Sequence, residues 1–382
     1  MRIVMLGTRG VPARYGGFET AIEEIGRRMT DRGHEVTVYC RGAEGEPPEH
    51  LGMKLVHLPA ARKKALETLS HTCLSVFHLL FSRRRHDVAF VFNAANAVFL
   101  PVLRLRRLPT AVHVDGLEWK RAKWGGAGRR YYRTAEALSV RWADALIADA
   151  QGIADYYTDE FGAPTELLVY GAPILTDRHT GRIAELELTD RGYHLVVARF
   201  EPENHVLEIV RGYRDSAATL PLVVVGSAPY ADEYTAQIEQ AAAGDPRIRL
   251  VGGVWDQDLL DALYANAASY LHGHSVGGTN PSLLRAIGAG APVIAYDVSF
   301  NAESLGPRSR YFTTSEDLAQ AVVAVEADVQ GAVDAAADIR NDIRDRYSWD
   351  AVTTGYVDLA SRLLAGQGQR GQVSGRRRSS RL

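Results

Sequence analysis

The sequence HGHSVGGTNPSLLRAIGAGAPVIAYD occupies residues 272–297 and decides the fold of the second half of the chain. The apolar residues 268–271 before it and 292–295 within it are typical of buried strands. Between them lie a pair of glycines and a short segment that begins with proline and ends with glycine, as many helices do. The pattern is strand, glycine loop, short helix and strand, which predicts an α/β domain.

The glycine loop has the composition of an anion-binding turn. Gly277 and Gly278 leave the backbone uncovered, and Thr279 or Asn280 can cap a helix that starts at Pro281. Unpaired N–H groups at the start of a helix attract phosphate. An ordinary tight turn in an α/β domain explains the glycines equally well, so the loop alone does not decide between these interpretations.

The start of the chain predicts a second α/β domain of the doubly wound kind. Residues 3–7 read as a buried strand, 18–32 as a helix and 35–40 as the next strand. The glycines between them lack the spacing of a dinucleotide fingerprint, and the second strand is followed by Arg41 where a ribose-binding acid belongs. These departures argue against a nicotinamide enzyme.

The length of 382 residues suits two domains of ordinary size. We predict an N-terminal Rossmann-like domain at 1–172, a linker at 173–190, a C-terminal domain at 191–345, a helix at 346–365 that crosses back to the first domain, and a disordered basic tail at 366–382. The tail prediction rests on its low-complexity, arginine-rich composition.

Charge is divided unevenly along the chain. Residues 1–170 hold 24 Lys and Arg against 19 Asp and Glu, whereas residues 171–365 hold 15 against 27. The formal net charge of -2 excludes the footprint of a nucleic-acid-binding protein. Cys40 and Cys73 lie in apolar runs and are expected to be buried thiols. With neither a signal peptide nor a membrane-spanning run, we expect a cytoplasmic protein, at most peripheral on the inner face of the cell membrane.

Residues 62–85 predict a helix with one apolar face and basic ends. Arg62, Lys63 and Lys64 open it, and Arg83-Arg84-Arg85 close it. A core-packed helix with solvated ends explains the pattern. A patch that rests on an anionic membrane near a lipid-linked acceptor explains it as well.

The predicted strand at 109–114 is followed at once by polar groups. His113, Asp115 and Glu118 stand where ligands bind, because the carboxyl ends of parallel strands face the ligand in such sheets. They are suited to handling an acceptor hydroxyl. The alternative is a plain turn in which Glu118 pairs with Lys120 or Arg121.

In the second half, Arg199 follows the predicted strand 193–198, and its planar guanidinium can bind a diphosphate. No lysine occurs after Lys123, so any cationic clamp there must be arginine. Asp256-Gln257-Asp258 spells a D-x-D, a metal-binding signature elsewhere, but acids at a helix start are also expected for capping. We predict capping and no metal site.

Four segments together resemble one enzyme family. HGHSVGGTNPSLL, GTRGVPARYGGFET near the start, VDGLEWKRAKW in the middle and ARFEPEN after the linker are similar to retaining glycosyltransferases with the GT-B fold. The nearest branch is that of the capsular and cell-wall β-1,4-rhamnosyltransferases. The resemblance implies two doubly wound domains that face a cleft. It also implies retaining, metal-independent transfer of a hexosyl group, L-rhamnosyl from dTDP-rhamnose, to a lipid-linked or polysaccharide-precursor sugar.

The resemblance also assigns site residues. Asp115, His113 and Arg199 take catalytic roles, and Glu118 and Trp119 lie on the acceptor side. The residues assigned to donor binding are Gly16, Gly17, Asn204, Gly226, Val251, Gly277, Gly278, Thr279, Asn280, Arg285 and Glu303. The donor is a co-substrate, and no further cofactor is expected.

One departure from the family pattern concerns Arg285. The broader family carries two glutamates around this helix, and the matching positions here are Gly277 and Arg285. Gly277 fits the rhamnosyltransferase-like branch, whereas Arg285 replaces the acid expected to hold the ribose. Arginine can only donate hydrogen bonds, so we predict that it joins the phosphate clamp. The departure also motivates two rivals, a nucleotide-sugar or glycan-binding protein without turnover and, less favoured, a nucleotide-sugar epimerase.

Overall fold

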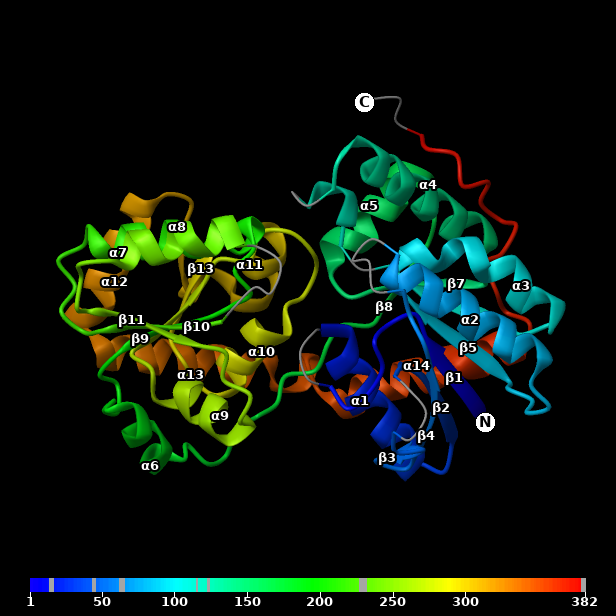
Figure 1. The fold of residues 1–382 in the computed structure, drawn as a ribbon, viewed down its shortest axis with the longest axis horizontal. Coiled ribbons are helices and arrows are strands. Elements are labelled where there is room, and N and C mark those ends of the chain that lie inside the picture. The colour runs from blue at the N-terminus through cyan, green and yellow to red at the C-terminus, as the bar shows by residue number, and fades with distance from the viewer. Residues whose placement is uncertain are drawn as a thin grey trace. The chain divides into compact units, whose positions relative to one another are not determined.

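The computed structural model describes residues 1–13, 17–42, 46–61, 66–114, 116–121, 124–226 and 232–378. The chain divides into two compact units. Unit 1 comprises Met1–Tyr170 together with Trp349–Leu382, and unit 2 comprises Gly171–Ser348. Each unit is built on its own sheet with helices on both faces (Figure 1). The expected pair of Rossmann-like α/β domains is confirmed.

In the described part of unit 1, eight strands form one sheet in the order β3-β4-β2-β1-β5-β6-β7-β8. The central strand pairs in parallel on both sides, with Ile3 opposite Val36 and Val88. Only the short hairpin of β3 and β4 is antiparallel. The strands are β1 (Arg2–Leu6), β2 (Glu35–Arg41), β3 (Glu49–His50), β4 (Met53–Leu58), β5 (Val88–Phe92), β6 (Thr110–His113), β7 (Ala145–Ala148) and β8 (Glu166–Leu167).

Helices cover both faces of this sheet. The helix expected to cross back, α14, belongs to unit 1 and packs against α1 on one face. On the other face α2 packs against α3 (Figure 1). The helices are α1 (Gly17–Asp31), α2 (Glu67–Phe81), α3 (Leu100–Leu105), α4 (Gly126–Trp142), α5 (Gln151–Phe161) and α14 (Trp349–Leu364), with short 3-10 turns η1 (Ala94–Phe99) and η2 (Glu118–Lys120).

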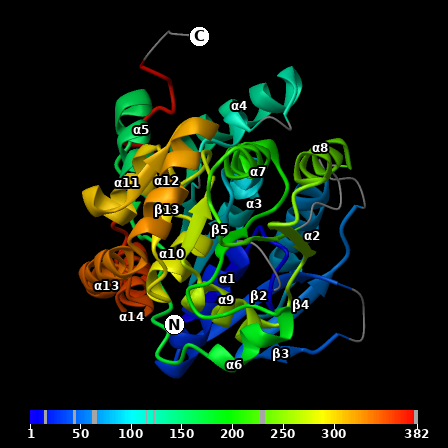
Figure 2. The same ribbon diagram turned by 90° about the vertical axis from the view of Figure 1, so that its left-hand side faces the viewer.

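Unit 2 has an all-parallel sheet in the order β11-β10-β9-β12-β13-β14 among its described residues. Its strands are β9 (His194–Val197), β10 (Leu222–Val225), β11 (Ile248–Gly252), β12 (Ser269–His272), β13 (Val293–Tyr296) and β14 (Arg310–Phe312). Its helices are α6 (Thr180–Ile183), α7 (Val206–Arg214), α8 (Asp232–Ala242), α9 (Gln257–Asn266), α10 (Pro281–Gly288), α11 (Ser299–Leu305), α12 (Ser315–Ala327) and α13 (Val329–Arg346). Helix α7 packs against α8 and α12, and α10 packs against α9 and α13 (Figure 2).

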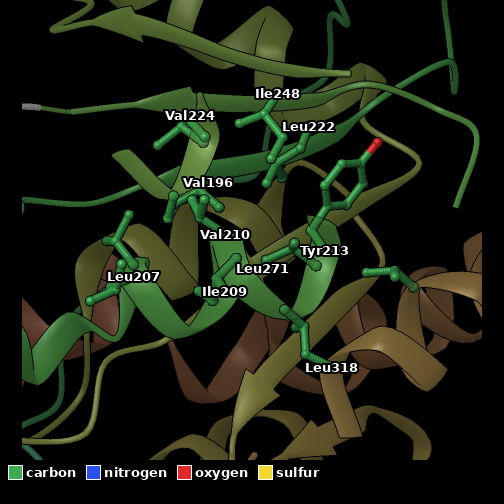
Figure 3. Packing of buried hydrophobic residues seen from close by; sticks show 14 of the residues in the cluster. Val196, Leu207, Ile209, Val210, Tyr213, Leu222, Val224, Ile248, Leu271 and Leu318 are labelled. Carbon is green, nitrogen blue, oxygen red and sulfur yellow. The ribbon is translucent and has the colours of Figure 1, made fainter. Parts of the chain in front are cut away.

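The core of unit 2 is apolar and closely packed around α7. Val196 and Val224 from the sheet meet Leu207 and Val210 from α7 (Figure 3). Val206, Ile209 and Val210 are fully buried, because every third or fourth residue of α7 is apolar. This core holds β9 and α7 in place, and the loop between them carries Arg199 and Asn204.

Each sheet reverses its strand order once. In unit 1 the reversal lies between β1 and β5, and in unit 2 it lies between β9 and β12. Open α/β sheets bind ligands outside the carboxyl ends of strands at such a reversal. The fold therefore points to the ends of β9 and β12 and to the ends of β1 and β5.

The structure differs from the sequence prediction in three segments. The basic helix expected at 62–85 is α2, Glu67–Phe81, and residues 62–65 lie outside the described part. The segment predicted as a linker contains α6 and the 3-10 turn η3 (Ala184–Leu186). The tail predicted to be disordered instead makes defined contacts over residues 366–378, where Arg377 donates to Glu136 and Tyr156.

Candidate functional site

The carboxyl edge of the unit 2 sheet gathers several polar residues, of which the sequence had assigned Arg199 and Asn204 to the site. Arg199 comes just after β9. On the neighbouring strand β12, His272 is the last residue, and His274 comes just after it. Asn204 ends the 3-10 turn η4 (Pro202–Asn204) between β9 and α7. Parallel strands that end side by side bring these groups to one edge.

Asn204 acts as a brace inside this edge. Its side-chain amide donates to the carbonyl of Arg199 at 2.8 Å, and its amide oxygen lies 2.8 Å from Nδ1 of His274. Because an amide oxygen can only accept, His274 must carry its proton on Nδ1. A Cβ atom on Gly273 would lie 2.1 Å from the carbonyl oxygen of Asn204, so only glycine fits there. Asn204 therefore fixes the backbone around Arg199 and His274.

Arg199 is the exposed cation of this edge. Its side chain is 50% exposed, and its Nη1 atom lies 3.5 Å from Glu201, a long and weak ion pair. The backbone carbonyl of the same residue is the one that Asn204 anchors. This arrangement suits a planar cation that binds a phosphate or diphosphate.

The glycine loop adopts the predicted geometry. Gly277 has a φ of 137°, and the side chain of Asn280 caps α10 by accepting from the N–H of Ser282 at 2.8 Å. Pro281 occupies the first turn. Of the two caps that the sequence allowed, Asn280 is the one used, whereas Thr279 is buried. The start of α10 presents N–H groups and the positive end of the helix dipole.

The sequence predicted that Arg285 joins a phosphate clamp, but its side chain is engaged by an acid of the protein itself. Its guanidinium forms an ion pair with Asp261 on the neighbouring helix α9. Glu303, which the resemblance assigns to donor binding, pairs with Arg346 at 2.6 Å. A phosphate-clamp role for Arg285 would require the Asp261 contact to open or to be shared.

Gly226 and Val251 stand on the far side of β9. A Cβ atom on Gly226 would lie 1.8 Å from the carbonyl oxygen of Ala198, and its φ is 154°, so glycine is required. Val251 is half-buried in the edge strand β11. Residues 227–231, which continue the glycine turn, lie outside the described part.

Sequence reasoning missed the histidines of this edge, the buried His272 and the half-buried His205. Burial lowers the pKa of His272 to about 3, so its ring is neutral. Its Nε2 has no hydrogen-bond partner among the described residues. His205 stacks on Tyr296 with ring centroids 4.1 Å apart and contacts the hydroxyl of Ser275 at 2.9 Å. The spacing His-Gly-His at the end of a strand was the signal available in the sequence.

In unit 1, His113 ends β6 inside an aromatic cage. It stacks between Phe92 and Tyr170, and Phe18 meets its ring edge-on. It is 1% exposed, and burial lowers its pKa to about 3. Neither ring nitrogen has a hydrogen-bond partner among the described residues. A neutral imidazole here can accept a hydrogen bond, but it does not supply positive charge at neutral pH.

The remaining acceptor-side predictions divide. Glu118 is buried and its carboxylate lies 2.5 Å from Nε of Arg121, which is the pairing of the plain-turn alternative. Trp119 is half-buried beneath two cations, Lys120 and Arg133. Gly17 is the first residue of α1. Asp115 and Gly16 lie outside the described residues.

Both halves of the chain match models of known families. Residues 16–171 match the glycosyl transferase 4-like domain, and residues 191–328 match the glycosyl transferases group 1 family. The chain carries the two domains of a glycosyltransferase. The boundary between the two matches lies in the segment predicted as a linker.

Solved structures share the fold of this glycosyltransferase over nearly its whole length. A sucrose-phosphate synthase from Thermosynechococcus elongatus superposes with a TM-score of 0.81 at 19% identity, covering 96% of this chain and 99% of that one. Anabaena HepE in complex with UDP-glucose gives a TM-score of 0.76 at 16% identity, covering 94% and 99%. These identities establish the GT-B fold alone.

One curated relative is similar over a shorter stretch of the glycosyltransferase. The O-antigen chain mannosyltransferase B of Escherichia coli is 25% identical over 128 residues, which is 32% of this chain. The match spans 33%, about a third, of the length of that relative.

The D-x-D of the glycosyltransferase caps a helix, as predicted. The Asp256 carboxylate accepts from the N–H groups of Asp258 and Leu259 at 3.0 and 3.1 Å, and it pairs with Arg182 at 2.9 Å. Hydrogen bonds to Arg182 and to the helix start lower its pKa. Within the described residues no group of three or more His, Cys, Asp or Glu side chains is placed to hold a metal ion.

Proposed function

We propose that this chain transfers a hexosyl group from a nucleotide-sugar donor to a lipid-linked or oligosaccharide acceptor with retention at the anomeric carbon. L-Rhamnosyl from dTDP-rhamnose is the favoured group, on the strength of the sequence resemblance. The observation that carries the proposal is the edge of unit 2 formed by Arg199 and the start of α10, held by the Asn204 brace. It offers a cation and helix N–H groups at a topological reversal, where a diphosphate binds.

The reaction breaks the bond from the anomeric carbon to the diphosphate oxygen and joins that carbon to an acceptor hydroxyl oxygen. The hydroxyl proton leaves with the nucleoside diphosphate. Negative charge gathers on the departing diphosphate, so Arg199 and the N–H groups of α10 would stabilise the transition state. We propose that these groups replace a metal ion, with Asp115 and His113 on the acceptor side.

The test is release of nucleoside diphosphate by the purified full chain. dTDP-rhamnose, UDP-glucose and GDP-mannose are each supplied with and without a short-chain lipid-diphosphate sugar. Acceptor-dependent release from dTDP-rhamnose with the anomeric configuration kept is expected. If nucleoside diphosphate is released from GDP-mannose and from neither of the other two donors, the transferred group is mannosyl and not rhamnosyl. Mannose is the sugar named for the relative in Escherichia coli. An inverted product would remove the retaining mechanism.

A donor-binding protein without turnover is the second candidate. The ion pair between Arg285 and Asp261 favours it, because the residue expected to serve the donor is engaged elsewhere. Tight binding of dTDP-rhamnose with no release in the presence of any acceptor would establish this candidate.

We further propose that α2 and α3 rest on an anionic membrane. Phe81 and Leu105 are 79% and 72% exposed, and Leu74 and Phe77 of the same helix α2 are also exposed. Arg83–Arg85 follow α2 after Ser82 and are exposed. Apolar side chains bordered by cations are the pattern of an interfacial surface. Within the described residues, no helix combines the length and apolarity needed to cross a membrane.

The position of this surface corrects one part of the sequence prediction. Arg83–Arg85 connect the end of α2 to the start of β5, so they lie at the amino edge of the sheet. His113, at the end of β6, lies at the opposite edge. Arg106, which follows α3, donates to the carbonyls of Leu80 and Ser82 at the end of α2. The membrane surface and the acceptor-side residues are therefore at different edges of the sheet.

Vesicle sedimentation tests the membrane proposal. The Arg83→Ser, Arg84→Ser, Arg85→Ser variant should bind phosphatidylglycerol vesicles less well, since each cation near an anionic surface contributes about 1 kcal/mol. A control variant with Ser at the exposed Arg141, Arg211 and Arg344 has the same net charge. Equal sedimentation of the two variants would show that total charge, and not this surface, is responsible.

A further inference from the structure

The segment that follows β6 in unit 1 concentrates aromatic and cationic side chains. Residues 118–133, EWKRAKWGGAGRRYYR, contain six Lys and Arg, four aromatic residues and one acid, Glu118. That acid is buried against Arg121. We give the name aromatic–cation cluster to four cations that are not paired with Glu118 and to three rings. The cations are Lys120, Arg129, Arg130 and Arg133, and the rings are those of Trp119, Trp124 and Tyr132.

Packing between η2 and the first half of α4 assembles this cluster. Arg133 lies over the ring of Trp119 at 5.3 Å, and Lys120 lies over the same ring at 5.6 Å. Trp124 packs against Tyr132 with ring centroids 5.0 Å apart. A cation over an aromatic face is attracted by the ring quadrupole and held in one place. The rings therefore fix cations that would otherwise be mobile.

Acids balance the charges of the cluster only in part: Glu136, three residues further along α4, interacts electrostatically with Arg133. Among the described residues, none of Lys120, Arg129, Arg130 and Arg133 forms an ion pair with an acid, and Arg129 and Arg130 are exposed. Both belong to the start of α4, whose first turn holds no acid, although helix starts favour negative charge. Placing cations beside one another and beside a positive helix end costs free energy, which a bound anion would offset.

The cluster also stands where a ligand is expected. η2 and the start of α4 follow the carboxyl end of β6, the edge at which open α/β sheets bind ligands. His113 ends that same strand. The cluster is thus separate from the Arg83–Arg85 surface, which lies at the amino edge.

We propose that the aromatic–cation cluster binds an anionic group of the acceptor, a phosphate or diphosphate ester next to the sugar that receives the hexosyl group. A planar guanidinium group can donate two parallel hydrogen bonds to two oxygens of one phosphate, and Lys120 adds a compact charge. The proposal rests on the proposed function, whose acceptor it describes. An acidic sugar carries the same kind of charge as a carboxylate, so the test separates the two sources.

The experiment measures binding of glucose 1-phosphate to the full chain by calorimetry, with glucuronic acid and methyl glucoside as comparison probes. The Arg129→Ser, Arg130→Ser variant should bind glucose 1-phosphate at least about tenfold more weakly, as expected when charge-assisted hydrogen bonds are lost. The Arg129→Lys, Arg130→Lys variant keeps the charge and should lose less. Arg141→Ser with Arg211→Ser removes two exposed cations elsewhere and should stay within about twofold of the parent.

Four outcomes would overturn the proposal. Unchanged binding by the Ser variant would remove the cluster from the site. Loss of binding in Arg199→Ala instead would place the anion in the unit 2 edge. Equal affinity for methyl glucoside would remove the need for charge. Loss of phosphatidylglycerol-vesicle binding with intact glucose 1-phosphate binding would assign the cluster to a membrane.

The remaining comparison separates the sources and the two proposals. Stronger binding of glucuronic acid than of glucose 1-phosphate would replace the phosphate ester by a carboxylate. If the cluster binds glucose 1-phosphate but no donor is ever turned over, the proposed function fails while the anion site stands. If donors are turned over and the Ser variant binds normally, only the anion site fails.

Discussion

Arg199 shows how one residue can be exposed and yet held in place. Its side chain is half in solvent, whereas its carbonyl is fixed by the buried amide of Asn204. Folding has already ordered the backbone of Arg199, so the guanidinium can bind a diphosphate with little further loss of conformational entropy.

We predict that Arg199→Ala weakens binding of the nucleoside diphosphate by about 1.5–3 kcal/mol, the range for charge-assisted hydrogen bonds. Calorimetry with dTDP measures this loss. The melting temperature should be unchanged, because the one ion pair that the removed side chain makes among the described residues is long. Arg211→Ala, an exposed arginine on α7, is the matched control. Equal affinity of both variants for dTDP would remove Arg199 from the donor site.

Asp256 is the residue at which a metal signature and a helix cap compete. Its carboxylate already accepts two backbone N–H groups and an arginine. We predict that turnover persists in excess EDTA. Asp256→Ala should lower the melting temperature through loss of the cap, whereas Asp256→Asn retains a capping oxygen and should lower it less. Activity abolished by EDTA and restored by manganese would contradict the capping assignment.

At the scale of elements, one of the contacts that hold the tail beyond α14 places Arg377 between two acids. Arg377 donates to Glu136 on α4 at 2.6 Å and to Glu160 on α5 at 3.2 Å, and it lies over the ring of Phe161. Burial raises the pKa of Glu136, while the hydrogen bond from Arg377 acts in the opposite direction. The tail therefore compensates a buried carboxylate between two helices.

Replacing Arg377 should consequently have a pH-dependent cost. Without Arg377 the pKa of Glu136 rises further above its ordinary value of 4.5. A carboxyl group whose folded pKa is raised stabilises the fold at low pH and loses that contribution as the pH rises through the folded pKa. The free energy of unfolding of Arg377→Ala should therefore be about 2–3 kcal/mol lower than that of the parent at pH 7, somewhat below the range for fully buried pairs. The difference should be smaller near pH 5.

Denaturant unfolding at the two pH values measures the loss. Arg376→Ala is the control, since Arg376 is exposed and neighbours Arg377 in the chain. A loss that is independent of pH, or equal in both variants, would show that the tail contacts do not govern the charge on Glu136.

The contacts of the tail show which features of the fold the sequence could not predict. The strands at 3–6, 88–92 and 222–225 were predictable because continuous apolar runs report burial on both faces of a sheet. Caps at Asp256 and Asn280 were predictable because capping is local. The pairing of Arg377 with Glu136 was not, since it joins residues 241 apart and the composition of the tail indicates disorder.

The same limit applies to the candidate site. Arg199 and the glycine loop could be chosen from their positions next to predicted strands. The partner of Arg285 depends on how α9 packs against α10, which no local pattern reports. The neutral state of His113 depends on a cage drawn from three separate segments. Local chemistry was readable, whereas the choice of distant partners was not.

At the scale of the whole molecule, the two units differ in how the chain builds them. Unit 2 is one continuous segment, Gly171–Ser348, with its own sheet and its own apolar core. Unit 1 is discontinuous, because α14 returns to it after unit 2 is complete. In unit 1, Tyr356 of α14 is fully buried, with its ring centroid 5.1 Å from that of Phe90 in β5, the strand next to β1.

This difference predicts unequal behaviour of fragments. Residues 171–348 should fold alone with a cooperative thermal transition, and they should bind dTDP within about tenfold of the full chain, because every donor-edge contact described above is internal to unit 2. Residues 1–170 should not fold cooperatively. They lack Tyr356 and the other buried side chains of α14, and loss of one large aromatic side chain alone costs about 3–5 kcal/mol, a large part of the stability of a domain.

Circular dichroism melts of both fragments, with dTDP calorimetry on the second, measure this asymmetry. Adding residues 349–382 to the first fragment through a flexible linker should restore its transition, because α14 would again cover α1 and β5. A fragment 1–170 that melts cooperatively by itself would show that α14 only decorates unit 1. If instead neither fragment folds, the stability of unit 2 depends on the rest of the chain, and its donor edge cannot be treated as an independent binding site.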